Sequence, residues 1–75
     1  MPRRRKLDNQ WDDLMSMCAK EKEYLTHGQH PKLVAFLTAR IDELALEMGF
    51  NSSQIKGREF RALKVDGCIV ELKTR

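Results

Sequence analysis

The sequence lacks the features that identify the commonest classes of enzyme and membrane protein. None of its apolar runs approaches the roughly 18 residues that a membrane span needs. It has no glycine-rich phosphate loop, and no serine or cysteine stands next to a histidine. A chain of 75 residues is also small for a pocket of about 300–1,000 Å³, the usual size of ligand sites. We therefore expect a non-enzymatic protein with no catalytic residues, no cofactor and no membrane insertion.

Cysteine and histidine are scarce, with two of each. Tetrahedral zinc sites use these residue types, but His27 and His30 flank a turn, while Cys18 and Cys68 lie in apolar stretches where free cysteines are common. A disulfide between the two cysteines does not suit a reducing compartment. Polar residues follow the basic start MPRRRK, where a signal peptide needs an apolar stretch. The sequence predicts a cytoplasmic protein without a metal site.

Charge is unevenly distributed along the chain. Residues 1–6 carry +4, residues 7–50 carry −4 with four basic against eight acidic side chains, and residues 51–75 carry +3. Folded nucleic-acid binders usually concentrate positive charge on the body of the domain, which here is acidic. We therefore interpret residues 1–7 as a basic flexible arm attached to one small domain, residues 8–75. The alternative is an arm that follows phosphates without sequence specificity.

A first helix is predicted over residues 9–27. Asn9 with Asp12 three positions later resembles an N-terminal capping box, and Gly28 is a typical end. Lys22 interrupts the apolar stripe at a position where another apolar residue is expected. The apolar positions of this helix are Trp11, Leu14, Met15, Cys18 and Leu25.

A second helix is predicted over residues 31–49, antiparallel to the first because the turn between them is short. Pro31 suits its first turn, Gly49 suits a left-handed ending, and Phe50 is placed to fold back onto the last turn. Asn51 or Ser52 can cap one further turn. The second helix is apolar over so much of its circumference that it needs cover on more than one side. Three positions widen its apolar surface: Leu33, Phe36 and Leu46.

The segment ALKVDGCIVELK, within residues of about 59–73, predicts a C-terminal hairpin. A type I′ turn at Asp66-Gly67 pairs Val65 with Cys68. The same register pairs Leu63 with Val70 and Arg61 with Leu72. An isolated hairpin is marginally stable in water, so this one is expected to pack on the helices. The predicted fold class is therefore α+β: an antiparallel helix pair followed by a two-stranded β-hairpin.

That register assigns one face of the hairpin to the core. Phe60 and Ile69 fall on the opposite face, which a single layer of helices leaves uncovered. A second copy of the chain or another protein is expected to cover them. The predicted core face consists of Leu63, Val65, Cys68, Val70 and Leu72.

Two classes of function follow from these patterns. In the first, the chain is a small regulatory protein that binds itself as a homodimer and binds an unidentified protein partner. The residues predicted for these contacts are Leu33, Phe36, Leu46, Phe60 and Ile69. In the second, the basic arm and the hairpin bind nucleic acid. The residues predicted for that alternative are Arg3, Arg4, Arg5, Lys6, Lys56, Arg58, Arg61, Lys64 and Lys73.

The stretch FLTARIDELALEMGFNSSQIK combines an apolar-x-x-x-Ile-x-Glu-Leu helix, a glycine ending and a polar loop before the hairpin. Its motif positions are Phe36, Leu37, Ile41, Glu43, Leu44, Gly49, Ser53, Ile55 and Lys56. This pattern, over residues of about 33–73, is similar to the GnsA/GnsB family of small enterobacterial proteins. The resemblance implies a helix-plus-hairpin protein of prophage type, non-enzymatic and linked to membrane-lipid composition and a toxin–antitoxin pairing. Residues 1–30 extend beyond the usual length of that family.

Overall fold

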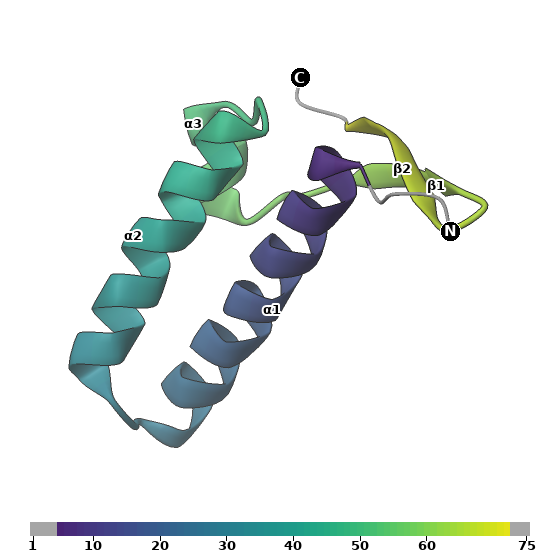
Figure 1. The fold of residues 1–75 in the computed structure, drawn as a ribbon. Helices are drawn as coiled ribbons and strands as arrows, with labels where there is room; N and C mark the ends of the chain where they lie inside the picture. The colour runs from purple at the N-terminus through teal and green to yellow at the C-terminus, as the bar shows by residue number, and fades with distance from the viewer. Residues whose placement is uncertain (1–4, 73–75) are drawn as a thin grey trace.

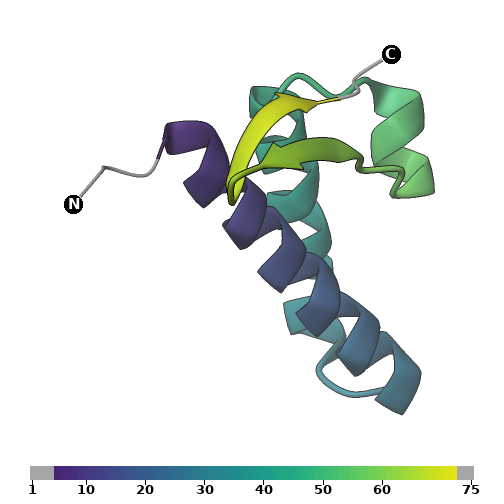
Figure 2. The ribbon, with the colours of Figure 1, turned by 90° about the vertical axis from the view of Figure 1, so that its right-hand side faces the viewer.

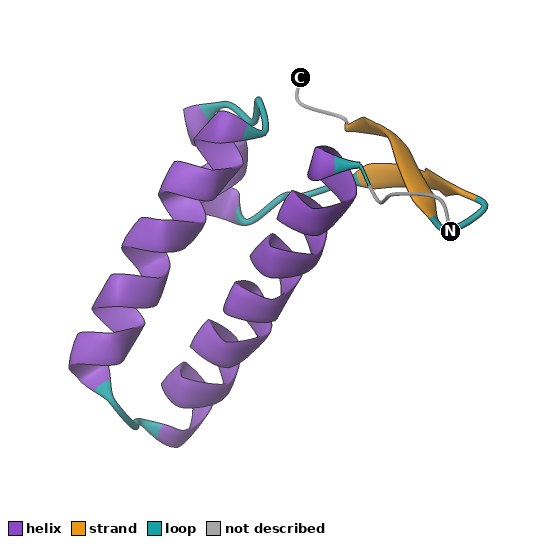
Figure 3. Cartoon of the chain, viewed as in Figure 1, coloured by secondary structure: helices purple, strands orange, loops and turns teal. Residues whose placement is uncertain are grey.

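The structure, a computed structural model, describes residues 5–72. Helices α1 and α2 lie side by side and antiparallel, and the hairpin lies beside the beginning of α1 (Figures 1 and 3). This arrangement confirms the predicted α+β fold. In chain order, the elements are α1 (Lys6–His27), α2 (Pro31–Glu47), α3 (Ser52–Gly57), β1 (Ala62–Val65) and β2 (Cys68–Leu72).

Helix α1 begins three residues before the predicted start. Arg5 is its N-cap in an extended conformation, and the Asn9 backbone N–H donates to the Arg5 carbonyl at 3.2 Å. Asn9 therefore lies inside the first turn and does not cap the helix, contrary to the prediction. Lys6 and Leu7 belong to the helix and not to a flexible arm. The other end is as predicted, because Gly28 is left-handed (φ 64°) and closes the helix.

Helix α2 ends in the way the sequence predicts. Gly49 has a positive φ of 100°. The Phe50 N–H donates to the Ala45 carbonyl five positions earlier, at 3.0 Å, which is the bond that defines a Schellman ending. The helix proper stops at Glu47, two residues before the predicted end. The further turn is α3, where the Asn51 side chain accepts from the Gln54 N–H in a reciprocal capping box.

The hairpin has the predicted turn but only part of the predicted register. Asp66 and Gly67 both have positive φ, as a type I′ turn requires, and Val65 pairs with Cys68. A bulge between Leu63 and Lys64 then shifts the pairing by one residue. The pairs beyond it are Leu63–Glu71 and Ala62–Leu72, so the predicted Leu63–Val70 and Arg61–Leu72 pairs were wrong.

The core lies where the hairpin crosses the helix pair, on the α1 side (Figure 2). Toward the α1–α2 loop the cover ends, and Leu25, predicted to face the core, is largely exposed. A small core therefore has to hold three helices and a hairpin together. Its buried side chains are Trp11, Leu14, Ile41, Ala45, Met48, Phe50, Ile55 and Ile69.

Candidate interaction surface

Helix α1 holds β2 through the backbone of Ile69. The carboxylate of Asp8, which is 2% exposed, accepts from the Ile69 N–H at 2.5 Å. The Arg5 guanidinium donates to the Ile69 carbonyl at 3.5 Å. Asp8 lies in the first turn of α1, where the helix dipole favours a negative charge. These contacts place β2, and not β1, against the start of α1.

The hairpin face that packs on the helices is opposite to the predicted one. Ile69 is 1% exposed and Phe60 is half-buried, with its ring edge-on to Phe50 at a centroid distance of 4.9 Å. The prediction that the helices leave these two residues uncovered was therefore wrong, and Ile69 is too buried to contact a partner. Alternation separates the two faces of a strand, but it does not say which face is buried when both carry apolar residues.

Four of the five residues expected in the core lie instead on the open side of the hairpin, and the side chain of the fifth, Leu72, is outside the described part of the chain. Leu63, Val65 and Val70 are each about half exposed. Cys68 lies between them in the hairpin and is partly buried. We call these four residues the outer hairpin face. The four residues lie on the side of the two strands that faces away from the core.

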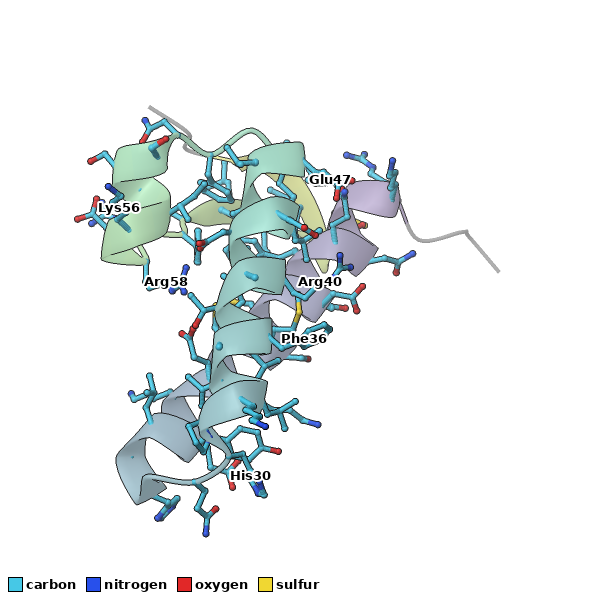
Figure 4. All side chains as sticks on the ribbon, turned by 90° about the vertical axis from the view of Figure 1, so that its left-hand side faces the viewer. His30, Phe36, Arg40, Glu47, Lys56 and Arg58 are labelled. Atoms are coloured by element: carbon cyan, nitrogen blue, oxygen red, sulfur yellow. The ribbon has the colours of Figure 1, made fainter. Side chains whose placement is uncertain are left out.

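The three predicted contacts on α2 are exposed, but they do not form one surface. Phe36 lines a groove of about 440 Å³ between α1 and α2 that also contains Met17 and Leu44. Leu46 lines a different groove, of about 160 Å³, beside Lys56 of α3. Figure 4 shows Phe36 and Lys56 on opposite sides of α2. Leu33 lies in the first turn of α2.

Arg58 connects the three helices. It has a positive φ of 54° just after α3, and its guanidinium binds Asp42 Oδ1 at 2.9 Å and Glu21 Oε2 at 3.0 Å, beside α2 (Figure 4). The Thr38 hydroxyl donates to the same Glu21 oxygen at 2.5 Å. Partial burial by itself lowers the pKa of Arg58, but the hydrogen bonds and charges of Asp42 and Glu21 outweigh it, so this pKa lies above its ordinary value. Arg58 is therefore engaged within the fold, contrary to the expectation of a nucleic-acid contact.

The other predicted basic contacts fall into two groups. Arg3, Arg4 and Lys73 lie outside the described residues. The other five of these predicted contacts are exposed to solvent: Arg5, Lys6, Lys56, Arg61 and Lys64.

A third groove, of about 460 Å³, runs along α1 beside the segment that leads into β1. Its volume is larger than the chain length led us to expect, although it lies on the surface and not inside the core. Burial raises the pKa of the Cys18 thiol in this groove, and the positive charge of Arg58 only partly opposes that effect. A thiol that stays protonated is a poor nucleophile. The residues that line the groove are Met15, Cys18, Glu21, Lys22, Leu25, Thr26, Arg58 and Phe60.

Residues 5–72 contain no cluster of three or more His, Cys, Asp or Glu side chains placed to hold a metal ion. Cys18 and Cys68 are free thiols, and His30 packs edge-on against Tyr24 at a centroid distance of 5.0 Å. In the same part of the chain, no helix is both long enough and apolar enough to cross a membrane.

The sequence interpretation missed two buried acids of α1. Asp8 and Glu21 are buried on the same helix as Trp11 and Leu14. The signal was present, since Asp8 precedes Trp11 by three positions and Glu21 follows Cys18 by three, so both acids continue the apolar stripe. The residue expected to interrupt that stripe, Lys22, is exposed. Comparisons of the chain with protein-family models, curated proteins and solved structures found no match.

Proposed function

We propose that this chain is a small, non-enzymatic regulatory protein that acts through protein–protein contacts at its outer hairpin face. One observation carries the proposal: Leu63, Val65 and Val70 are half exposed on a hairpin whose opposite face is filled by Ile69 and Phe60. Contiguous apolar surface of this kind is typical of interaction sites. The hairpin cannot turn this face inward without losing its core contacts. Within residues 5–72 nothing covers it, and we expect another molecule to do so.

The surroundings of the outer hairpin face suit a protein partner. Arg61 and Asp66 are exposed beside the aliphatic centre and supply charges of both signs. An apolar centre with a polar rim is the usual composition of a protein interface. We therefore expect a partner that presents an apolar patch with mixed charges at its border.

The similarity of residues 33–73 to the GnsA/GnsB family supports a regulatory role in this proposal. It favours a bacterial or prophage setting and a link to a toxin–antitoxin pairing, and the polar residues after the basic start favour a cytoplasmic location. The order of α2, a glycine ending and the hairpin agrees with the architecture that the resemblance implies.

Photocrosslinking in the cells that naturally make the protein tests this proposal. A benzophenone amino acid is placed at Val70, on the outer hairpin face, and as a control at Arg40, an exposed position of α2. We expect a discrete adduct with another protein from position 70 and none from position 40. Mass spectrometry of the adduct then identifies the partner. Identical adduct patterns from the two positions would show that the outer hairpin face has no special role.

Nucleic-acid binding is the second candidate, favoured by the exposure of Arg61 and Lys64 at β1. Such binding depends on release of counterions from phosphates, so its affinity falls steeply as salt rises. Titration of random-sequence duplex DNA at low and moderate salt measures this dependence. The absence of binding at low salt would remove the second candidate and leave the first.

A further inference from the structure

The two edges of the hairpin differ in their surroundings. At Ile69 of β2, the N–H donates to Asp8 of α1, and the carbonyl accepts from Arg5, the N-cap of α1. Among the described residues, no hydrogen bond joins β1 to a group outside the hairpin. The edge of β1 is therefore the open edge of this sheet.

The contact of β2 with α1 also fixes which backbone groups of β1 face outward. Ile69 is the partner of Lys64, and its N–H and carbonyl point away from β1. In an antiparallel pair, such a position is a non-hydrogen-bonded pair, so the N–H and carbonyl of Lys64 point away from β2. Because the direction alternates along a strand, Ala62 presents its backbone groups to the same edge.

We propose that a second copy of this chain pairs with that edge, β1 against β1 and antiparallel, with Leu63 on the two-fold axis. Ala62 of each copy then exchanges both backbone hydrogen bonds with Lys64 of the other. Leu63 faces Leu63 in a non-hydrogen-bonded pair, where side chains approach most closely. An interface of this kind is self-complementary and closes on two copies.

Charge and strand length select this register over its neighbours. In this register three of the four residues of β1 pair with β1 of the other copy. Arg61, just before the strand, lies opposite Val65 of the other copy, next to that copy's Asp66. A shift toward the turn sets Lys64 opposite Lys64, and like charges directly opposite each other are destabilising. A shift the other way sets Lys64 opposite Phe60 and leaves Ala62 as the one residue of β1 that pairs with β1 of the other copy.

The pairing rests on the proposed function and deepens it. It names one partner, a second copy of the chain, and it describes the surface that a further protein would contact. Two hairpins joined at β1 form one sheet, and their outer hairpin faces become continuous across the axis. Leu63, Val65 and Val70 of both copies then face the same side. The aliphatic surface offered to a further protein is doubled, while the opposite side of the sheet stays on the two helix pairs.

Disulfide trapping tests the register directly. Leu63→Cys is made in a Cys18→Ser, Cys68→Ser background, with Val65→Cys in the same background as the matched control. Leu63 lies opposite itself at a Cα separation of about 4.5 Å, within the range of about 4.4–6.8 Å that a disulfide requires. Val65 lies opposite Arg61, far from the other Val65. We expect mild oxidation to give a covalent dimer from Leu63→Cys and none from Val65→Cys. The reverse result would overturn the register.

Sedimentation of the wild-type chain at high micromolar concentration tests the association itself. We expect a species of about twice the 8.8 kDa chain mass, and a return to the single mass in Leu63→Lys, which sets two like charges at the axis. Val70→Lys, on β2 and away from the edge, is expected to keep the double mass. A wild-type chain at the single mass would overturn the inference.

The two proposals fail separately. The benzophenone amino acid is moved to Val65 so that Val70→Lys can be tested in the same chain. Loss of the partner adduct from position 65 in Val70→Lys, with the double mass retained, would leave the dimer standing and locate partner binding on the outer hairpin face. A monomeric wild-type chain that still gives a partner adduct at position 70 would overturn the dimer and leave the proposed function standing. Circular dichroism of each variant checks that the helices are intact.

Discussion

Both faces of the hairpin carry apolar residues, but their environments are opposite. Ile69 and Phe60 on the inner face pack on the helices, whereas Leu63, Val65 and Val70 on the outer hairpin face remain half exposed. The outer hairpin face carries more aliphatic side chains than the inner face, so hydrophobicity alone favours the wrong orientation. The difference teaches that a polar anchor can decide the orientation of a hairpin, because Asp8 of α1 binds one backbone position of β2.

The largest expected effect comes from shortening one side chain on each face. Ile69→Ala leaves a cavity in a core of few residues and is expected to lower the free energy of unfolding by about 2–5 kcal/mol. Val70→Ala removes methyl groups that are already half in water and is expected to change it by less than about 0.5 kcal/mol. Urea unfolding of both variants measures the contrast. Equal losses would mean that the two faces are equally buried.

A smaller effect is expected at the anchor itself. Asp8→Ala leaves the Ile69 N–H without its acceptor in a buried position, at a cost of about 1–3 kcal/mol. Asp8→Asn keeps a side-chain oxygen that can accept, so its loss is expected to be smaller. The exchange rate of the Ile69 amide hydrogen reports on this contact directly. An unchanged exchange rate in Asp8→Ala would show that the anchor does not hold the hairpin.

The smallest effect is expected at Arg58, which fixes the chain just before Phe60 enters the inner face. Arg58→Ala breaks the contacts to Glu21 and Asp42, but Arg58 and Asp42 are partly solvated. We therefore expect a loss of about 1 kcal/mol, near the upper end for ion pairs in contact with water. Lys56→Ala, an exposed position of α3, is the matched control with no expected loss. Thermal unfolding of the two variants side by side measures the difference, and equal midpoints would count against a structural role for this network.

Several elements of the fold could be predicted because their signals are local. Pro31 and Gly49 mark the two ends of α2 to within two residues. Asn51 caps α3, and the Asp66-Gly67 turn has the positive φ values that its type requires. Each of these signals depends on the conformational freedom of a few neighbouring residues. A derivation from one sequence can therefore identify them without knowledge of the rest of the molecule.

The candidate site was predicted only in part, because its chemistry depends on residues far apart in the chain. The exposure of Leu33, Phe36 and Leu46 followed from the width of the apolar surface of α2. Ile69 and Phe60 were assigned to the wrong face, and the outer hairpin face was taken for core. The bulge that shifts the register beyond Lys64 has no signal in the residues around it.

The sequence by itself determined the order of helices and strands, the helix endings and the turn of the hairpin. Only the tertiary structure decided where α1 begins, which face of the hairpin is buried and where Arg58 binds. The physical reason is distance along the chain: Asp8 and Ile69 are 61 positions apart, and Arg58 and Glu21 are 37 apart. Periodicity records which residues share a face, whereas the partner of a buried charge is set by packing that brings distant segments together.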